Sequence, residues 1–362
     1  MAVPRMVEDA GRPTLSSPEM DEPTRERYAD LLWAQPEWLA EAHAWIEEQL
    51  DARSASLAGE IEQVHLVPWS TVLRVPTLDG DLFFKAVRAD GAFEPALTAL
   101  LAERWPERIA EPVAVDPARG WMLTRDAGTR LREQLTSAVD LHHWETLLPA
   151  YAELQIQLAP CAGDLLALGV PDMRLSTIPG LLDDLLDDPE ALLLDLPDGL
   201  TSDELGRMRE CLPEIAAMCR ELAGYGIPET LQHDDFHDGN VFVRDGRYVF
   251  FDWGDSCLSH PFHTMVVTLR STALRLDLEP GGRELIRLRD TYLEAFGSFA
   301  RHEALVEAFE IAYRVGTLGR ALSWHRYVKA SDPRYRSEVA DAVPYGLQRF
   351  LERGPIGSWR WE

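Results

Sequence analysis

The feature that most constrains this 362-residue chain is a stretch of alternating polar and apolar segments at residues 231–255. Two short apolar runs in this stretch flank Asp245-Gly246, and Asp-Gly between alternating apolar residues is a strong signal for a β-hairpin. Asn240 stands just before the first run, and Asp252 stands just after the second. Because the two strands of a hairpin fold back on each other, we expect Asn240 and Asp252 to lie side by side.

A third oxygen-bearing side chain, that of Asp235, precedes the predicted hairpin on a loop, five residues before Asn240. Carboxylate and amide oxygens that converge at one end of a sheet suit a magnesium–nucleotide phosphoryl-transfer site. The spacing H-x-D-x-x-x-x-N, followed by a hairpin and then D-x-G, is also close to the paired catalytic and metal loops of kinases. The stretch therefore predicts phosphoryl transfer.

Two alternatives stay open for this stretch. Asp, Asn and Gly are common turn residues, so any one of them alone fits a solvated turn. A metal-dependent phosphohydrolase of the His-Asp type could use His233, Asp234 and His237 as ligands. Such enzymes set their ligands on helices, however, and a hairpin at this point argues against that class. The joint spacing favours phosphoryl transfer.

The loop residues carry a resemblance to a known family. His-Asp-Asp-Phe-His-Asp-Gly-Asn at 233–240 resembles the H-G-D-x-H-x-x-N loop of the aminoglycoside phosphotransferase and choline kinase-like family. Phe-Asp-Trp-Gly at 251–254 resembles the I-D-W metal loop of that family. The resemblance covers about residues 61–325. It implies an α+β, bilobal protein-kinase-like fold with a small antiparallel-sheet N-lobe and a mainly helical C-lobe.

The resemblance also implies roles for the residues of these loops. Asp235 would be the catalytic residue that orients or deprotonates the acceptor hydroxyl, while Asn240 and Asp252 would hold magnesium ions. His233 and His237 would brace the loop by hydrogen bonds and take no part in the chemistry.

The chain departs from the family pattern at three points. Asp234 replaces the usual glycine, and Thr264 stands three residues after Pro261, where the family often has an aspartate. Kinases that cover the phosphates with a glycine-rich loop need a close approach of the backbone, but no glycine occurs between residues 61 and 79. We expect the hydroxyls of Ser70 and Thr71 to take over the phosphate contacts.

If the chain is a kinase, its amino-terminal half should form a small sheet with a lysine on the third strand. Strands are predicted at 61–67, 72–77 and 82–87, and the third contains Lys85. Only Lys85 and Lys329 are lysines among the 35 basic residues of the chain. In a sequence so rich in arginine, a lysine at this position suggests a compact point charge for a nucleotide phosphate. The alternative is an ordinary lysine on a strand edge.

The segment after this strand predicts a helix at 90–105, with apolar residues at helical spacing. Glu94 near its start is the nearest partner for Lys85, and Glu103 is the fallback. Glu94 could instead simply be a favourable acid at a helix amino terminus. Two more strands are predicted at 111–115 and 121–124. By the resemblance, backbone groups of Leu123 and Arg125 would meet the adenine edge of the nucleotide.

The remaining chain is predicted to be mainly helical, and by the resemblance the acceptor would bind between the catalytic loop and these helices. Candidate acceptor residues are Asp255, Trp324, His325 and Tyr327. The predicted domains are a disordered lead (1–24), N-terminal helices (25–60), an N-lobe with the nucleotide-binding sheet and helix (61–125) and a helical C-lobe with the catalytic and metal loops (126–355). Predicted helices include 131–158, 181–194, 202–222, 264–276, 282–296, 304–327 and 334–351.

Composition limits the partners. The formal net charge of −26 argues against nucleic acid and acidic membranes. No run of about eighteen apolar residues occurs, so no membrane span is expected. The acidity suits a cationic substrate, or it merely keeps the protein soluble. Four cysteines without a metal-ligand spacing fit thiols in a reducing cytoplasm.

Together these observations predict a magnesium-dependent phosphotransferase that moves the γ-phosphoryl group of ATP or GTP to a hydroxyl of a small molecule. The alternative, favoured by the glycine-free phosphate loop and Thr264, is a nucleotide-binding regulator that transfers no phosphate. The identity of the acceptor, the choice between ATP and GTP and the oligomeric state do not follow from the sequence.

Overall fold

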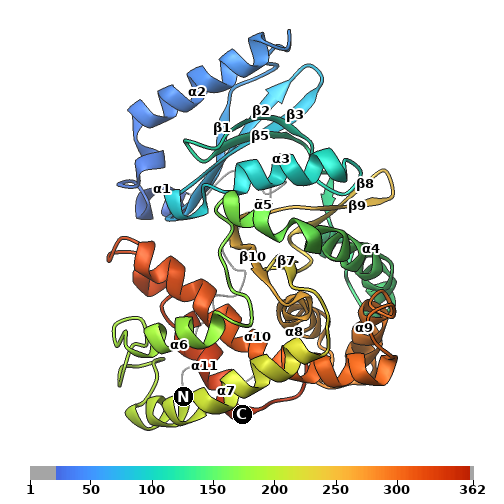
Figure 1. The fold of residues 1–362 in the computed structure, drawn as a ribbon. Coiled ribbons are helices and arrows are strands. Elements are labelled where there is room, and N and C mark those ends of the chain that lie inside the picture. The colour runs from blue at the N-terminus through green and yellow to red at the C-terminus, as the bar shows by residue number, and fades with distance from the viewer. Residues whose placement is uncertain (1–21, 359–362) are drawn as a thin grey trace. The chain divides into compact units, whose positions relative to one another are not determined.

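The structure, a computed structural model, describes residues 22–358. The described chain forms two compact units (Figure 1): a sheet unit of residues 22–131 with 239–254, and a helical unit of residues 132–238 with 255–358. The sheet unit thus includes the hairpin that we expected in the C-lobe. The predicted disordered lead lies outside the described residues, except for its last three residues, which begin helix α1.

The sheet unit is built on a five-stranded antiparallel sheet with the strand order β1-β2-β3-β5-β4. Each of the five strands was predicted from the sequence to within about two residues, because apolar β-formers alternate with turn residues in this segment. The strands are β1 Glu62–Val67, β2 Ser70–Thr77, β3 Gly80–Val87, β4 Pro112–Asp116 and β5 Trp121–Arg125.

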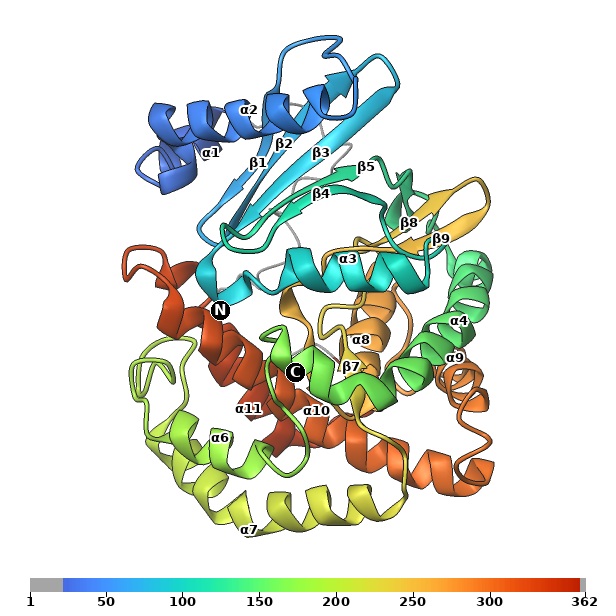
Figure 2. The same cartoon turned by 45° about the horizontal axis from the view of Figure 1, so that its top comes forward.

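Helices cover both faces of this sheet (Figure 2). Rings of Trp38 and Trp45 on one face meet Phe84 and Trp121 of the sheet, with ring centroids 5.6–6.3 Å apart. Edge-to-face aromatic contacts of this kind add to the burial of apolar surface. The helices are α1 Glu22–Arg27, α2 Pro36–Asp51 and α3 Glu94–Arg104. Pro36 stands at the first position of α2, where its missing N–H costs no bond within the helix.

The predicted hairpin is present. Strands β8 Val241–Arg244 and β9 Arg247–Phe250 pair in antiparallel register, and β6 Thr129–Arg130 joins β8 on its other side. Asp245 and Gly246 at the tip both have positive φ, 51° and 73°. A two-residue turn with both φ values positive is the type I′ turn that Asp-Gly favours, and its twist matches that of the strands.

The helical unit is organised around the long helix α10, which neighbours α6, α7, α8, α9 and α11 (Figure 1). A short two-stranded sheet of β7 Thr230–Gln232 and β10 Cys257–Ser259 carries the loop at 233–238. The helices are α4 His142–Leu158, α5 Ala162–Ala167, α6 Ile178–Leu186, α7 Ser202–Gly224, α8 Thr264–Leu276, α9 Arg283–Glu294, α10 His302–Ala330 and α11 Ala342–Glu352. No helix within residues 22–358 is both long and apolar enough to span a membrane.

The largest differences from the predicted helices occur where polar residues compete for the backbone. The helix predicted from residue 131 begins at His142, because short 3-10 turns and a capping box at Ser137 precede it. The helix predicted over 181–194 ends at Leu186. Within the rest of the predicted span, Leu193 has a positive φ of 46°, which a helix does not allow. Asp195 and Asp198, between that span and α7, also have positive φ.

Candidate active site

Lys85 lies on β3, an inner strand of the sheet, opposite Val72 and Met122. Its Nζ is 2.7 Å from Oε1 of Glu94, the first residue of α3, and 2.6 Å from Oδ1 of Asp252. Glu94 is fully buried and Lys85 is 7% exposed. An inner, buried position excludes the strand-edge alternative for Lys85, and the short distance identifies Glu94 as its partner.

Two carboxylates therefore share one buried ammonium group. Burial acts to lower the pKa of Lys85, but the charges of Asp252 and Glu94 outweigh it and raise this pKa above its ordinary value. Lys85 is consequently a fixed cation. An ammonium group held in this way presents a compact positive charge at a defined place in the sheet unit.

The hairpin brings Asn240 and Asp252 to its open end. The backbone N–H of Phe251 donates to the carbonyl oxygen of Asn240 at 3.0 Å, which extends the ladder beyond the pair Val241 and Phe250. Asp252, the next residue, has a positive φ of 64°. Aspartate is among the few residues that tolerate this conformation. The fold-back expected from the sequence thus exists in the backbone.

An amide oxygen and a carboxylate are hard ligands of the kind that magnesium prefers. The side chains of Asn240 and Asp252 therefore fit the ion in chemical type. Between residues 22 and 358 no group of three or more His, Cys, Asp or Glu side chains is placed to hold a metal. Magnesium in nucleotide sites is bound through one or two protein ligands together with substrate phosphates, and needs no such group.

Gly254, the glycine of the D-x-G pattern, lies where its loop closely approaches the side chain of Glu94. A Cβ atom at this position would lie 3.0 Å from Oε2 of Glu94 and 3.9 Å from Oδ1 of Asp252. The carboxylate of Glu94 is held by Lys85 and has little freedom to move away. A residue without a side chain lets this loop pass close to the Lys85–Glu94 pair.

The structure changes the expectation for the phosphate loop. The turn between β1 and β2 is only two residues long, so Ser70 and Thr71 belong to β2. The Thr71 hydroxyl is fully buried, donates to the carbonyl oxygen of His65 at 2.7 Å and accepts from Gln63 at 2.9 Å. The Thr71 hydroxyl is therefore not available for the phosphate contact that we expected. Ser70, at the first position of β2, stays a prediction.

The expected adenine contacts of β5 also need correction. Leu123 pairs with Phe84 on one side and Ala114 on the other, and an inner strand uses its backbone groups in the sheet. The backbone N–H of Arg125 donates to the carbonyl oxygen of Glu111 at 2.9 Å. The pairing of Leu123 and the N–H of Arg125 are thus already part of the sheet. An adenine contact of the Arg125 carbonyl stays a prediction.

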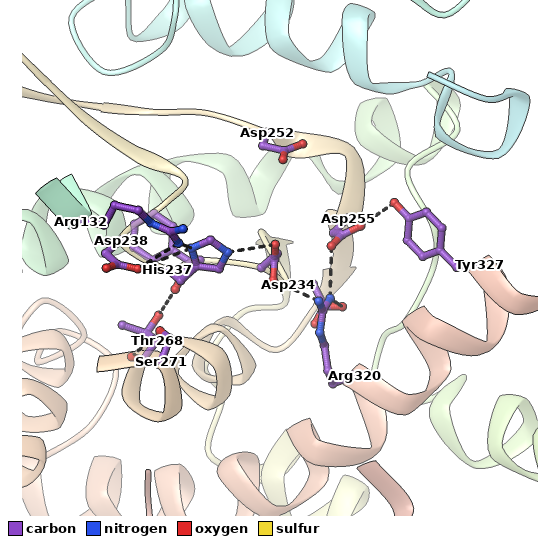
Figure 3. Close-up of polar contacts among 12 residues, drawn as sticks. Arg132, Asp234, His237, Asp238, Asp252, Asp255, Thr268, Ser271, Arg320 and Tyr327 are labelled. Carbon is purple, nitrogen blue, oxygen red and sulfur yellow. Dashed lines mark hydrogen bonds and ion pairs between the residues drawn. The ribbon is translucent and has the colours of Figure 1, made fainter. Parts of the chain in front are cut away.

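In the helical unit, Asp235 is held on both carboxylate oxygens. Arg320 Nη2 donates to Oδ1 at 3.0 Å, and His237 Nε2 lies 3.3 Å from Oδ2. His237 in turn lies near Arg132 and Asp238, as Figure 3 shows. His237 therefore contacts the predicted catalytic residue itself.

The loop around Asp235 is braced by residues that the motif does not contain. The backbone N–H of His233 donates to the Tyr151 hydroxyl at 3.2 Å, and the Tyr151 ring stacks on Phe236 at 4.0 Å. Thr268 donates to the carbonyl oxygen of Phe236 at 2.6 Å (Figure 3). These bonds hold the loop although Thr264 stands where the family often has an aspartate.

Arg320 of α10 was not predicted from the sequence. Besides Asp235, its guanidinium group bonds Asp234 Oδ2 at 3.1 Å and Asp255 Oδ2 at 3.3 Å (Figure 3). Burial acts to lower the pKa of Arg320, but the three carboxylates outweigh it and raise that pKa. Burial raises the pKa of Asp234 even though Arg320 counteracts it. Three carboxylates around one guanidinium leave an excess of negative charge.

Three of the four candidate acceptor residues gather at this cluster. The Tyr327 hydroxyl donates to Asp255 Oδ1 at 2.5 Å, and the Trp324 ring lies 5.0 Å from the Arg320 guanidinium carbon. His325 differs, because its Nε2 is 3.0 Å from Asp188 Oδ2, in the segment that follows α6. His325 thus contacts a different part of the helical unit.

Solved structures share this fold across most of the chain. An ethanolamine kinase from Plasmodium vivax superposes with a TM-score of 0.58 at 14% identity, covering 92% of this chain and 93% of its own. A choline kinase from Streptococcus pneumoniae gives 0.56 at 13%, covering 86% and 98%. An amicoumacin kinase in complex with AMP-PNP, Ca²⁺ and Ami has a TM-score of 0.50 at 12% identity, covering 94% of this chain and 98% of its own. A comparison with curated protein sequences found no match.

The fold and the paired loops define the class of kinase-like phosphotransferases, and the predicted α+β protein-kinase-like fold is confirmed. The chain belongs to the phosphotransferase enzyme family, whose model matches residues 64–306, more than half of the sequence. The resemblance stated for the loops at 233–240 and 251–254 is thereby confirmed at the level of the family.

Proposed function

We propose that this protein is a magnesium-dependent phosphotransferase that moves the γ-phosphoryl group of ATP or GTP to a hydroxyl of a small molecule. The observation that carries this proposal is the ion-paired set of buried Lys85, buried Glu94 and partly exposed Asp252 in the sheet unit. A cation between two carboxylates, next to a hairpin that begins with Asn240, supplies the charges that phosphate and magnesium require.

On the nucleotide side, the ammonium group of Lys85 contacts a phosphate, and Glu94 keeps that ammonium in place. Asn240 and Asp252 hold magnesium, which neutralises negative charge on the phosphates when it is bound. Lys85 is then shared between Asp252 and the nucleotide. Ser70 is the hydroxyl that we propose near the phosphates.

On the acceptor side, Asp235 orients the hydroxyl and accepts its proton as the bond from its oxygen to the γ-phosphorus forms and the bond to the leaving nucleoside diphosphate breaks. A small-molecule acceptor is supported by the names of the structural relatives, which are kinases of ethanolamine, choline and amicoumacin. The excess of carboxylates around Arg320 favours a neutral or cationic acceptor over an anionic one. Tyr327 and Trp324 are proposed to line its site. We propose the cytoplasm as the compartment, where the four free cysteines stay reduced.

One observation favours a second function. The Thr71 hydroxyl is bonded within the sheet and the chain has no glycine-rich phosphate loop, which suits a nucleotide-binding regulator without transfer activity. Thermal denaturation with and without magnesium-ATP, followed by a mass-spectrometric screen of hydroxylated compounds, separates the two functions. Stabilisation together with a phosphorylated product supports the transferase. Stabilisation without any product across aminoglycosides, amino alcohols and sugars supports the regulator.

A further inference from the structure

We infer that Arg320 is a positioning residue for Asp235, and that Asp234 anchors Arg320. The inference rests on the proposed function, because Asp235 needs a fixed orientation only if it acts on an acceptor. All the residues involved belong to the helical unit. None of the contacts depends on a bound ligand.

Arg320 and His237 together fix the plane of the Asp235 carboxylate. Each of them reaches a different oxygen, Arg320 at 3.0 Å and His237 at 3.3 Å. A carboxylate bonded through only one oxygen can still rotate about its last torsion, whereas one held through both cannot. The lone pairs that remain on Asp235 therefore keep a constant direction, as a group that orients an acceptor hydroxyl requires.

Arg320 itself is held on several sides. Its Nη1 donates to Asp234 and to Asp255 (Figure 3). The ring of Trp324 lies 5.0 Å from its guanidinium carbon. The residue is 7% exposed. A planar guanidinium with several donors can bond three carboxylates at once in a rigid fork, whereas an ammonium group is a flexible point charge. Only arginine can therefore connect the three aspartates in this way.

Asp234 occupies a backbone position that favours glycine. Its φ is +62°, in the left-handed region that few residues other than glycine adopt. The side chain that glycine would lack is held by its neighbours, because Gln232 Nε2 donates to Oδ1 at 2.9 Å and Arg320 donates to Oδ2. An aspartate at this strained position thus supplies an anchor for Arg320. This pairing links the departure from the H-G-D pattern to the arginine on α10.

The test is magnesium-ATP hydrolysis, with water as the acceptor, in wild-type protein and in variants of the whole chain. Arg320→Ala is expected to lower kcat by about 10²-fold, the loss typical of a misplaced catalytic group, and to leave KM for magnesium-ATP unchanged. Arg320→Lys is expected to recover little of the loss, although it keeps the charge. Added guanidinium ion is expected to restore part of the kcat of Arg320→Ala, a rescue that a purely structural role would not produce.

Asp234 is tested by a double-mutant cycle. Asp234→Gly is expected to lower kcat by about tenfold and to cause no further loss in the Arg320→Ala background, because the two residues act as one unit. Arg314→Ala is the matched control, since Arg314 lies on the same helix and pairs with Glu214. Thermal denaturation of each variant verifies folding, and Arg320→Lys, which leaves the cluster with a cation, covers a failure of Arg320→Ala to fold.

The outcomes separate this inference from the proposed function. If Asp235→Asn hydrolyses magnesium-ATP as fast as the wild type, the role of Asp235 fails and the inference fails with it. If the wild type hydrolyses none, the same variants are compared by transfer of the γ-phosphoryl group to a panel of hydroxylated compounds, and equal transfer by Asp235→Asn and the wild type has the same meaning. If Asp235→Asn is impaired but both Arg320 variants keep the wild-type kcat, the inference alone is overturned. Loss of kcat in Arg320→Ala and Arg320→Lys, with an unchanged KM and guanidinium rescue, supports it.

Discussion

Lys85 Nζ lies 2.6 Å from Asp252 Oδ1, so the lysine proposed to contact the nucleotide bonds the carboxylate proposed to hold magnesium. Glu94 bonds the same ammonium group from its other side. Removal of the lysine would leave two acidic groups near each other without a cation. Nucleotide binding and metal binding should therefore depend on the same three residues.

Replacement of Lys85 should weaken nucleotide binding. A hydrogen bond to a charged group contributes about 1.5–3 kcal/mol, so Lys85→Ala should raise the Kd for magnesium-ATP by about 10- to 100-fold. Lys85→Arg should not restore binding, because the buried position between Glu94 and Asp252 suits a compact ammonium. The only other lysine, Lys329, is exposed and provides the control. Calorimetric titration measures these affinities, and an equal loss in Lys329→Ala would refute the assignment.

Replacement of Asp252 should change the requirement for magnesium. Asp252→Asn keeps the shape of the side chain but removes the charge. The magnesium concentration that gives half-maximal activity should therefore rise by at least about tenfold. Asp245→Asn, at the exposed tip of the same hairpin, is the matched control, because asparagine tolerates its positive φ. Magnesium titrations at saturating nucleotide measure the effect. Superimposable titrations for the wild type and Asp252→Asn would rule out Asp252 as a ligand.

A methyl group at Gly254 should disturb the Lys85–Glu94 pair. Its Cβ would lie 3.0 Å from the Glu94 carboxylate, and overpacking of this kind costs about 1–3 kcal/mol. Gly206→Ala in α7 meets no atom within 4 Å and should instead stabilise the chain by about 0.5–1 kcal/mol. Urea denaturation measures both changes. A Gly254→Ala variant as stable as the wild type, with unchanged nucleotide affinity, would disprove the close approach.

Buried histidines should make the protein sensitive to acid. Burial lowers the pKa of His263 to about 3, and it also lowers the pKa of its neighbour His260. The unfolded chain takes up a proton below its ordinary histidine pKa and the folded chain does not, so stability falls as the pH drops from about 6.5 towards 3. Each such histidine contributes a slope of about 1.4 kcal/mol per pH unit.

The comparison of wild type with His263→Gln isolates this contribution from that of the carboxylates. Between about pH 6 and pH 4, the unfolding free energy of the wild type should fall more steeply than that of His263→Gln. The difference in slope should be up to about 1.4 kcal/mol per pH unit, which corresponds to one proton. Urea denaturation at several pH values provides the slopes. Parallel curves for the two proteins would show that His263 is not held in its neutral form.

The sequence predicted the parts of the site that depend on local pattern. The hairpin followed from Asp245-Gly246, and its fold-back follows from strand geometry alone. The pairing of Lys85 with Glu94 could be predicted because a strand and the helix after it keep a short connection. In both cases residues near each other in the sequence determine the contact.

The wrong and missed predictions concern contacts that depend on packing, which short-range sequence patterns do not determine. We expected β2 to begin at residue 72, which left Ser70 and Thr71 in a turn, but the turn is two residues shorter and the Thr71 hydroxyl bonds within the sheet. Arg320 is one of 33 arginines and lies 85 residues from Asp235, so no spacing marks it. The signal available in the sequence was Asp234 itself, since an aspartate at a usual glycine position calls for a partner.

Phosphoryl transfer itself is tested most directly with ATP that carries a labelled γ-phosphate. Wild-type protein with magnesium should transfer the label to at least one compound of a hydroxylated panel, while Asp235→Asn binds magnesium-ATP normally and transfers at least about 10²-fold more slowly. Labelled product from the wild type and almost none from Asp235→Asn is the predicted result. Equal transfer by the two proteins, or no labelled product from the wild type across the whole panel, would contradict the account.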